Sequence, residues 1–229
     1  MTRTQLRRSA SPRAREKFYK RPFDLTVIVL AHLLLLPIWI LLWGLIPLFI
    51  WLEDRGPIFY PQKRVGKKGR VFSILKFRTL VPNADRSVRA WTVPDQQYVT
   101  RVGRILRRTA LDELPQVLNI LTGDMSFVGP RAMPLDEFQE FRDKIPGLEQ
   151  RLTVRPGLTG MAQVYGEGVR DAREKLRYDL DYVRRMGLLL DVKLMLLSVR
   201  NTLLARWDKE GRIQTSGIAD SSNGQVDLR

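Results

Sequence analysis

The stretch LTVIVLAHLLLLPIWILLWGLIPLFIWL, residues 25–52, decides the fold of this chain. It is apolar throughout except for Thr26 and His32. A run of roughly 20 apolar residues is enough to span a bilayer as a helix. The run is longer than the apolar core of a signal peptide, and no small-residue cleavage site follows it. A single membrane-spanning helix is the simplest interpretation of this segment.

Proline and flanking charge favour a different topology. Pro37 lies inside the run, and a proline removes a backbone donor and clashes with the preceding turn, so the helix should break there; Pro47 adds a second distortion. Both flanks are rich in Lys and Arg, which stay on the cytoplasmic side. We therefore predict a re-entrant membrane hairpin over residues 22–54, hinged near Pro37. The backbone groups at the break need partners from within the protein, and His32 reaches either the interface or a partner inside the hairpin.

Composition limits the chemistry of the chain. Its 229 residues carry a net charge of +15, which implies an anionic partner such as nucleic acid, anionic lipid or a phosphorylated substrate. There is no cysteine and His32 is the one histidine, so a thiol nucleophile is excluded and a Ser-His-Asp relay would need a membrane-like histidine. A carboxylate is the nucleophile that remains.

The rest of the chain divides into four parts. Residues 1–21 form a basic flexible arm that tethers anionic lipid, residues 22–54 form the hairpin, residues 55–207 form a catalytic domain, and residues 208–229 form a polar, disordered tail. The pattern predicts a hairpin turn at 64–70 before a strand at 71–78, a loop at 82–97, and helices at 101–108, 135–144, 171–186 and 188–207. The last helix is apolar but carries spaced charges, which suits the headgroup layer. The fold class is α/β, mostly helical with one small sheet, with amphipathic interfacial helices.

Two adjacent carboxylates, Asp112 and Glu113, lie between a basic segment and an apolar one. Thr109 followed by Asp112 resembles a capping box, and Pro115 is tolerated in the first turn of a helix. A helix N-terminus would keep Asp112 ionised and attract phosphate. Paired carboxylates are more often a solvated helix face. Here the arginine-bearing loops 123–131 and 154–160 favour phosphoryl chemistry, because arginine binds phosphate oxygens through a bidentate fork and a carboxylate can attack phosphorus.

Several motifs together resemble the bacterial sugar transferases of the monotopic phosphoglycosyl transferase superfamily. They are KRPFD (20–24), GPIF (56–59), QKRVG (62–66), KFRT (76–79), LDELPQ (111–116), Asn119, GDMSFVGPR (123–131) and VRPGLTG (154–160). The resemblance runs from about Lys20 to Trp207. It implies a membrane-dipping hairpin and a cytoplasmic catalytic domain that uses magnesium at the inner membrane of a bacterium.

The resemblance also implies a mechanism and a set of site residues. Asp112 attacks the β-phosphate of a nucleoside diphosphate sugar, usually a UDP-sugar, and polyprenyl phosphate then attacks the intermediate. Glu113 assists, either through magnesium bound with Asp112 or by taking a proton from the acceptor. The matching substrate- and phosphate-binding positions are Lys76, Arg78, Arg107, Arg131, Arg155 and Asp179.

The chain departs from the family pattern at three positions: Leu36 replaces a serine before the hinge proline, Ala132 replaces a proline, and Met161 replaces a tryptophan. An inactive family member is one alternative, and a non-catalytic basic membrane protein that binds anionic lipid or nucleic acid is another. We expect no nucleic acid partner for the enzyme. Packing through the last helix or the hairpin could build a homodimer. No stretch of the sequence identifies the sugar, the nucleotide or the downstream glycan.

Overall fold

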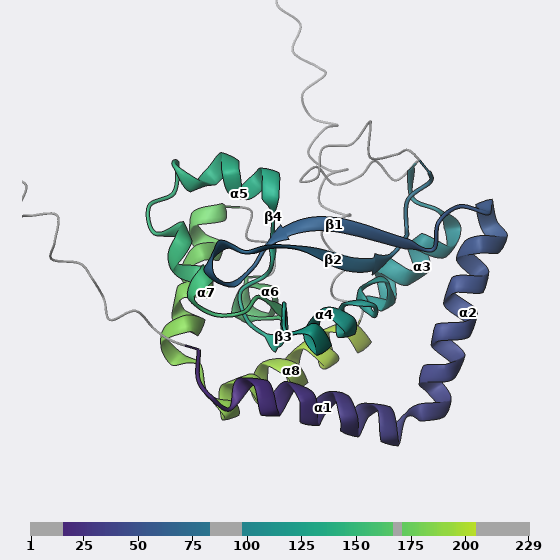
Figure 1. The fold of residues 1–229 in the computed structure, drawn as a ribbon, viewed down its shortest axis with the longest axis horizontal. Coiled ribbons are helices and arrows are strands. Elements are labelled where there is room, and N and C mark those ends of the chain that lie inside the picture. Colours follow the sequence, from purple (N-terminus) through teal and green to yellow (C-terminus); the bar gives the residue numbers. More distant parts are fainter. Residues whose placement is uncertain (1–15, 83–97, 167–170, 205–229) are drawn as a thin grey trace, which may run out of the picture.

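The computed structural model describes residues 16–82, 98–166 and 171–204 (Figure 1). The predictions for residues 1–15 of the arm, for most of the 82–97 loop and for the 208–229 tail lie outside the described residues. Residues 16–21, assigned above to the arm, pack against the domain: helix α1 (Lys20–Leu34) already begins at Lys20, which is buried.

Two helices form the predicted helix–break–helix. Helix α1 ends at Leu34, and α2 (Leu36–Asp54) follows it after Leu35, whose φ of −116° and ψ of 21° interrupt the helix. Figure 1 shows α1 along the lower edge of the molecule and α2 rising at a wide angle from its end. The break lies two residues before Pro37, because a proline is well accommodated in the first turn of the helix that follows.

Side chains within the hairpin make contacts at the break, where the Ala31 carbonyl also accepts from the Leu35 backbone N–H at 3.0 Å. The Trp39 indole donates to the carbonyl of Ala31 at 3.1 Å, and the ring of His32 stacks on Trp39 at 4.3 Å between centroids. His32 therefore has a partner inside the hairpin, which is one of the two roles predicted for it. The family pattern has a serine at position 36, but Leu36 has no side-chain hydrogen-bonding group. Trp39 supplies a side-chain hydrogen bond at the break.

Helix α2 is the candidate membrane helix. Among the described residues it alone is long and apolar enough to cross a bilayer, by length and composition, with 19 residues and a mean hydropathy of 1.9. Only 11% of its apolar window is buried within the protein. The apolar side chains that α2 exposes form a surface of the kind that contacts a membrane or another protein.

The domain that follows the hairpin contains two small sheets instead of the single one predicted. Strands β1 (Phe59–Val65) and β2 (Val71–Phe77) form an antiparallel hairpin, and β4 (Met133–Pro134) adds to the free edge of β1. This confirms the predicted turn and strand. Strands β3 (Ser126–Val128) and β5 (Gly157–Thr159) pair in parallel. A side chain at Gly157 would lie 2.1 Å from the backbone nitrogen of Gly129, so this close pairing requires glycine.

Helices cover the sheets. Four of them lie where the sequence predicted helices: α3 (Arg101–Thr109), α5 (Leu135–Arg142), α7 (Ala172–Arg185) and α8 (Leu188–Leu203). Two shorter helices are α4 (Gln116–Thr122) and α6 (Met161–Tyr165). Three short 3₁₀ segments are η2 (Lys67–Gly69), η5 (Leu111–Glu113) and η6 (Leu148–Thr153).

Helix α3 packs inward through Gly103 and Leu106 and not through Ile105. The Ile105 side chain is exposed, whereas Gly103 and Leu106 are buried. A Cβ atom at Gly103 would lie 2.2 Å from the carbonyl oxygen of Thr79. Helix α3 therefore packs closely against the segment that follows β2, and glycine makes this contact possible. Ile105 lies about 200° around the helix from Gly103 and therefore faces outward.

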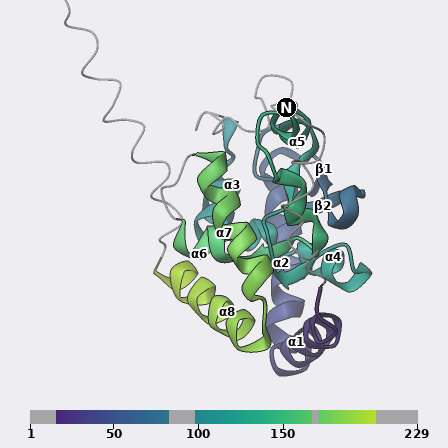
Figure 2. The ribbon, with the colours of Figure 1, turned by 90° about the vertical axis from the view of Figure 1, so that its left-hand side faces the viewer.

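Helix α8 is amphipathic. Asp191, Leu194 and Asn201 face the interior, while Leu189, Leu196 and Leu203 are exposed. Figures 1 and 2 both place α8 and α1 along the same end of the molecule. The outer leucines of α8 therefore lie at the same end as the apolar hairpin.

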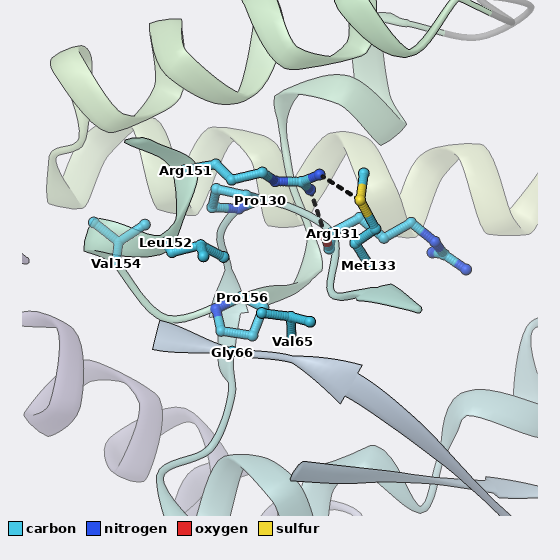
Figure 3. Close-up of a pocket in the computed structure, with 9 residues that line it drawn as sticks. All are labelled: Val65, Gly66, Pro130, Arg131, Met133, Arg151, Leu152, Val154 and Pro156. Carbon is cyan, nitrogen blue, oxygen red and sulfur yellow. Dashed lines mark hydrogen bonds between the residues drawn. The ribbon is translucent and has the colours of Figure 1, made fainter. Parts of the chain in front are cut away.

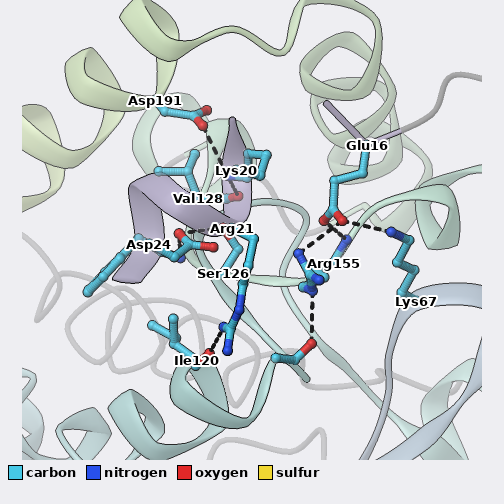
Figure 4. A network of polar contacts seen from close by, with 12 residues as sticks. Glu16, Lys20, Arg21, Asp24, Lys67, Ile120, Ser126, Val128, Arg155 and Asp191 are labelled. Carbon is cyan, nitrogen blue, oxygen red and sulfur yellow. Dashed lines mark hydrogen bonds and ion pairs between the residues drawn. The ribbon is translucent and has the colours of Figure 1, made fainter. Parts of the chain in front are cut away.

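Both ends of the hairpin are attached to one domain. At the start of α1, Lys20 Nζ contacts Asp191 of α8 at 3.0 Å and donates to the Val128 carbonyl at 2.6 Å (Figure 4). At the end of α2, the Asp54 carboxylate accepts from Arg78 at 2.6 Å, and Glu53 accepts from the first backbone N–H groups of α3. The chain thus leaves the domain at Lys20 and returns to it at Asp54.

We expect Lys20→Met to lower the free energy of unfolding by about 3–5 kcal/mol, because it leaves the buried Asp191 carboxylate without its cation. Urea unfolding in detergent, followed by circular dichroism, measures this loss. Lys17→Met is the matched control, since Lys17 is exposed and its replacement should stay within about 0.5 kcal/mol. A loss under about 1 kcal/mol for Lys20→Met would contradict the assigned role of the ion pair.

Candidate active site

The carboxylate pair lies on η5, between α3 and α4. Helix α3 ends at Ala110, which has a left-handed φ of 56° and turns the chain. The Thr109 hydroxyl donates back to the Ile105 carbonyl at 2.9 Å, so the predicted capping box is wrong: Thr109 still belongs to the last turn of α3. Pro115 immediately precedes α4, where proline was expected to be tolerated.

Two leucines fix this turn to the membrane hairpin. Leu111 and Leu114, on either side of the carboxylates, pack against a cluster that contains Ile46 and Ile50 of α2. Phe77 and Leu106 complete the cluster. The turn therefore rests on the candidate membrane helix.

Glu113 accepts from two cationic side chains. Its Oε1 atom accepts from Lys76 Nζ at 2.7 Å and from Arg131 Nη2 at 3.3 Å. Burial alone would raise the pKa of Glu113, but the charges of Lys76 and Arg131 outweigh it and lower the pKa to about 2. Glu113 is therefore fully ionised at neutral pH.

Asp112 has the opposite environment. Within the described part of the chain its carboxylate makes no hydrogen bond. Burial, the largest effect, raises the pKa of Asp112 to about 6, and the neighbouring Glu113 adds to the rise against the charges of Lys76, Arg107 and Arg131. A carboxylate with this pKa is mostly ionised at pH 7 and is more basic than an ordinary aspartate. Its oxygens are free to attack an electrophile.

Arg107 completes the group around Asp112. Its Nε atom donates to Thr79 Oγ1 at 2.9 Å, and this bond holds the side chain beside the segment that follows β2. Burial lowers the pKa of Arg107 and Asp112 opposes that shift. The structure thus brings together five of the predicted site residues: Lys76, Arg107, Asp112, Glu113 and Arg131.

Three other predicted residues have structural partners elsewhere. Arg78 binds Asp54 and donates to the Leu80 carbonyl at 2.9 Å, so it fastens the end of α2. Arg155 donates to the Gly123 carbonyl at 2.8 Å and pairs with Glu16 at 3.0 Å (Figure 4). Asp179 is buried and pairs with Arg151 at 2.8 Å.

Several residues that build the site were missed in the sequence. Arg64, Arg151 and Asp191 are buried charged side chains, and Glu16 joins Arg155 to Lys67. The signal for Asp191 was present, because an acid on the inner face of an apolar helix needs a buried partner. Arg64 and Arg151 carried no such signal.

The donor set suits a magnesium ion shared with a substrate. Across residues 16–82, 98–166 and 171–204, no group of three or more Asp, Glu or His side chains could hold a metal. Asp112 and Glu113 provide two carboxylates, and magnesium is commonly held by one or two carboxylates together with substrate phosphates. Asp112 and Glu113 could therefore supply part of the ligand set of a magnesium ion, with the remaining ligands coming from other molecules.

Comparison with known proteins identifies the chain. The profile of the bacterial sugar transferase family matches residues 15–205. The exopolysaccharide production protein ExoY of Sinorhizobium fredii is 35% identical over 202 residues, which cover 82% of this chain and 86% of that protein. A UDP-glucose:undecaprenyl-phosphate glucose-1-phosphate transferase of Caulobacter vibrioides is 39% identical over 197 residues, 84% of this chain and 72% of that protein.

A longer relative matches through part of its length. The Aeromonas hydrophila UDP-N-acetylgalactosamine-undecaprenyl-phosphate N-acetylgalactosaminephosphotransferase is 36% identical over 81% of this chain, which spans 44% of that protein. The fold and the relatives define an enzyme of the phosphoglycosyl transferase class. The chain belongs to the bacterial sugar transferase family.

The two carboxylates should titrate far apart. We expect the Asp112 carboxyl carbon to titrate near pH 6 and Glu113 near pH 2, measured by ¹³C NMR in detergent with Asp112→Asn for assignment. Lys76→Met should move both values upward, because it removes a positive charge that lowers each pKa. Lys63→Met, at an exposed position of β1, should leave both unchanged. Titration of both groups near pH 4 would refute the assignment.

Proposed function

We propose that this protein transfers a sugar phosphate from a UDP-sugar to undecaprenyl phosphate, giving polyprenyl diphosphate sugar and UMP. One observation carries the proposal: the Asp112 carboxylate, with a raised pKa and no hydrogen bond from the described residues, lies near three cationic side chains on a turn packed against a candidate membrane helix. Names of relatives support both substrates, since enzymes of Caulobacter and Aeromonas are named for a UDP-sugar and undecaprenyl phosphate.

The reaction takes two displacements on phosphorus. An oxygen of Asp112 attacks the β-phosphorus of the donor, and the bond from that phosphorus to the bridging oxygen breaks, so UMP leaves with the electron pair. A phosphate oxygen of undecaprenyl phosphate then attacks the same phosphorus and releases Asp112. Lys76, Arg107 and Arg131 are placed to neutralise the phosphoryl oxygens, which is the main requirement of phosphoryl transfer.

The environment of Glu113 favours one of its two predicted roles. A carboxylate with a pKa of about 2 is a poor base for removing a proton from the acceptor. It is well suited to hold Lys76 and Arg131 and to share a cation with Asp112. A magnesium ion held by these two carboxylates and the diphosphate would neutralise charge on the donor.

The alternatives explain less of the structure. A non-catalytic basic membrane protein does not account for two neighbouring carboxylates with opposite pKa shifts. An inactive family member would be expected to have lost the site, but the two carboxylates and the three cationic side chains around them are all present. Met161 is buried in the core beside Val164 and Tyr182, and the carbonyl of Ala132 is bound by Arg64.

UMP release tests the proposal. The protein, in nanodiscs with undecaprenyl phosphate and magnesium, is given a panel of UDP-sugars, because the relatives differ in the sugar that their names carry. We expect release with one sugar, lost on chelation and reduced at least about 10³-fold by Asp112→Asn, which removes the nucleophile. Asp143→Asn, at an exposed position, is the matched control and should keep full activity. Silence across the panel from folded, membrane-bound protein would favour the inactive or scaffold alternatives.

We also propose that α1 and α2 form a re-entrant hairpin, with the domain on the cytoplasmic face of the inner membrane as the first membrane step of glycan assembly. The attachment of both ends of the hairpin to one domain supports this topology, because a straight span would separate Lys20 from Asp54 by a bilayer.

Cysteine labelling tests the topology without background, since the chain has no cysteine. We expect Lys17→Cys and Lys68→Cys, both exposed and on opposite sides of the hairpin in the sequence, to be protected from an impermeant maleimide in intact spheroplasts. Both should react after lysis. Labelling of only one of them in intact spheroplasts would establish a single span instead.

A further inference from the structure

Two buried arginines hold the loop that carries Arg131. Arg64 of β1 donates from Nη1 to the Ala132 carbonyl at 2.7 Å. Arg151 of η6 donates from Nη2 to the Arg131 carbonyl at 2.5 Å. Two neighbouring carbonyl groups are thus bound by guanidinium groups that the proposed reaction does not use.

Asp179 anchors one of the two arginines. Its carboxylate pairs with Arg151 at 2.8 Å, and the two side chains are 3% and 6% exposed. Figure 3 shows Arg151 reaching to the Arg131 carbonyl and the Met133 sulfur beside a small pocket. A continuous set of contacts therefore runs from α7 through Arg151 to Arg131 and on to Glu113.

Backbone contacts with β5 already hold the start of the loop, where the Gly157 N–H donates to the Pro130 carbonyl at 2.9 Å and Arg131 forms a bridge with Gly157. The two arginines add support directly after this point. Strand β4, which follows it, has two residues, and Ala132 leaves φ free where a proline would fix it. Binding the carbonyls of residues 131 and 132 fixes the direction in which the Arg131 side chain leaves the backbone.

Stability alone does not explain this arrangement. Burial and the nearby charge of Arg131 lower the pKa of Arg64 to about 10, so two like charges have been placed close together. Well-packed apolar residues are often as stable as a buried ion pair or more so. Retaining buried charges beside an active site indicates a role in the chemistry.

We propose that Arg64 and Arg151, with Asp179 behind Arg151, are positioning residues that hold the Arg131 guanidinium beside Glu113 for the transfer reaction. The inference rests on the proposed function for its effect on rate, but the clamp itself is a property of the protein without substrate.

Conservative variants test the clamp. Arg151→Lys keeps the charge but removes the planar guanidinium, whose Nη2 atom binds both Asp179 and the Arg131 carbonyl while Nη1 contacts the Met133 sulfur. The lysine side chain ends one bond short of Nη2 and lacks this fixed geometry. Asp179→Asn keeps the shape and removes the anion. Arg142→Lys is the matched control, because Arg142 is an exposed arginine of α5 paired with Glu149. Circular dichroism and thermal unfolding establish that each variant is folded.

The first readout is hydrogen exchange of peptides covering residues 126–134 in the absence of substrate. We expect faster exchange there in Arg151→Lys, Arg64→Lys and Asp179→Asn, with the β1–β2 hairpin turn and the Arg142→Lys control unchanged. Unchanged exchange in residues 126–134 in all three variants would overturn the clamp.

The second readout is kcat/KM for UMP release in a double-mutant cycle with Arg131→Ala. We expect Arg151→Lys to reduce kcat/KM by up to about 100-fold when Arg131 is present, because small misplacements of a catalytic group are this costly. In the Arg131→Ala background the same substitution should cost less than about 3-fold, since its target is gone. Equal losses in both backgrounds would assign Arg151 a general structural role and overturn the proposal.

The two readouts separate the two proposals. If wild-type protein releases no nucleotide from any donor, the transfer reaction fails while the exchange measurement still decides the clamp. If release is normal and exchange does not change, the transfer reaction stands and the positioning role fails. If Arg151→Lys does not fold, Asp179→Asn and Arg64→Lys supply the same comparisons.

Discussion

The buried ion pair between Lys20 and Asp191 is the interaction on which the arrangement of membrane hairpin and domain depends. Such a pair is stable only if its remaining hydrogen-bonding groups are satisfied. Here the hydroxyl groups of Tyr19 and Tyr182 donate to Asp191 at 2.8 Å each, and Lys20 also donates to the Val128 carbonyl. One turn later, Asp24 accepts from Ser126 and from the backbone of Phe127. The first helix of the hairpin is thus fixed to α8 and β3 before it enters its apolar stretch.

The far end of the hairpin is fixed by Arg78 and Asp54, and between the two anchors α2 packs against the turn that carries Asp112. Asp112, the nucleophile of the proposed reaction, is therefore held at a constant position relative to an apolar helix. For a reaction between a water-soluble donor and a lipid-borne acceptor, this geometry reduces the positioning cost that a free domain would meet. The two adjacent carboxylates differ in their surroundings. Lys76 and Arg131 bind Glu113 directly, while Asp112 has no hydrogen-bonding partner in the described structure.

Arginine serves two different purposes within a short distance. Arg107 and Arg131 face the carboxylates, whereas Arg78, Arg151 and Arg155 bind backbone carbonyls and buried acids. The same five-donor fork suits a phosphate and a carbonyl group equally well. A motif can therefore show that an arginine is required without showing which of these partners it binds. Prediction from sequence accordingly included Arg78 and Arg155 among the phosphate ligands and missed Arg64 and Arg151.

The sequence by itself determined the broken apolar hairpin, the antiparallel strand pair, the helical segments and the carboxylate pair, because each is a local pattern of hydrophobicity, proline or adjacent charge. It also placed Lys76, Arg107 and Arg131 near Asp112 through motifs. Only the tertiary structure decided that the helix breaks at Leu35, that Ile105 faces outward, and that β3 and β5 pair in parallel. It alone separated the arginines that face the carboxylates from those that hold the fold. These outcomes depend on contacts between residues far apart in the chain, such as Lys20 with Asp191 and Arg64 with Ala132, and no local pattern specifies which distant group a buried charge will meet.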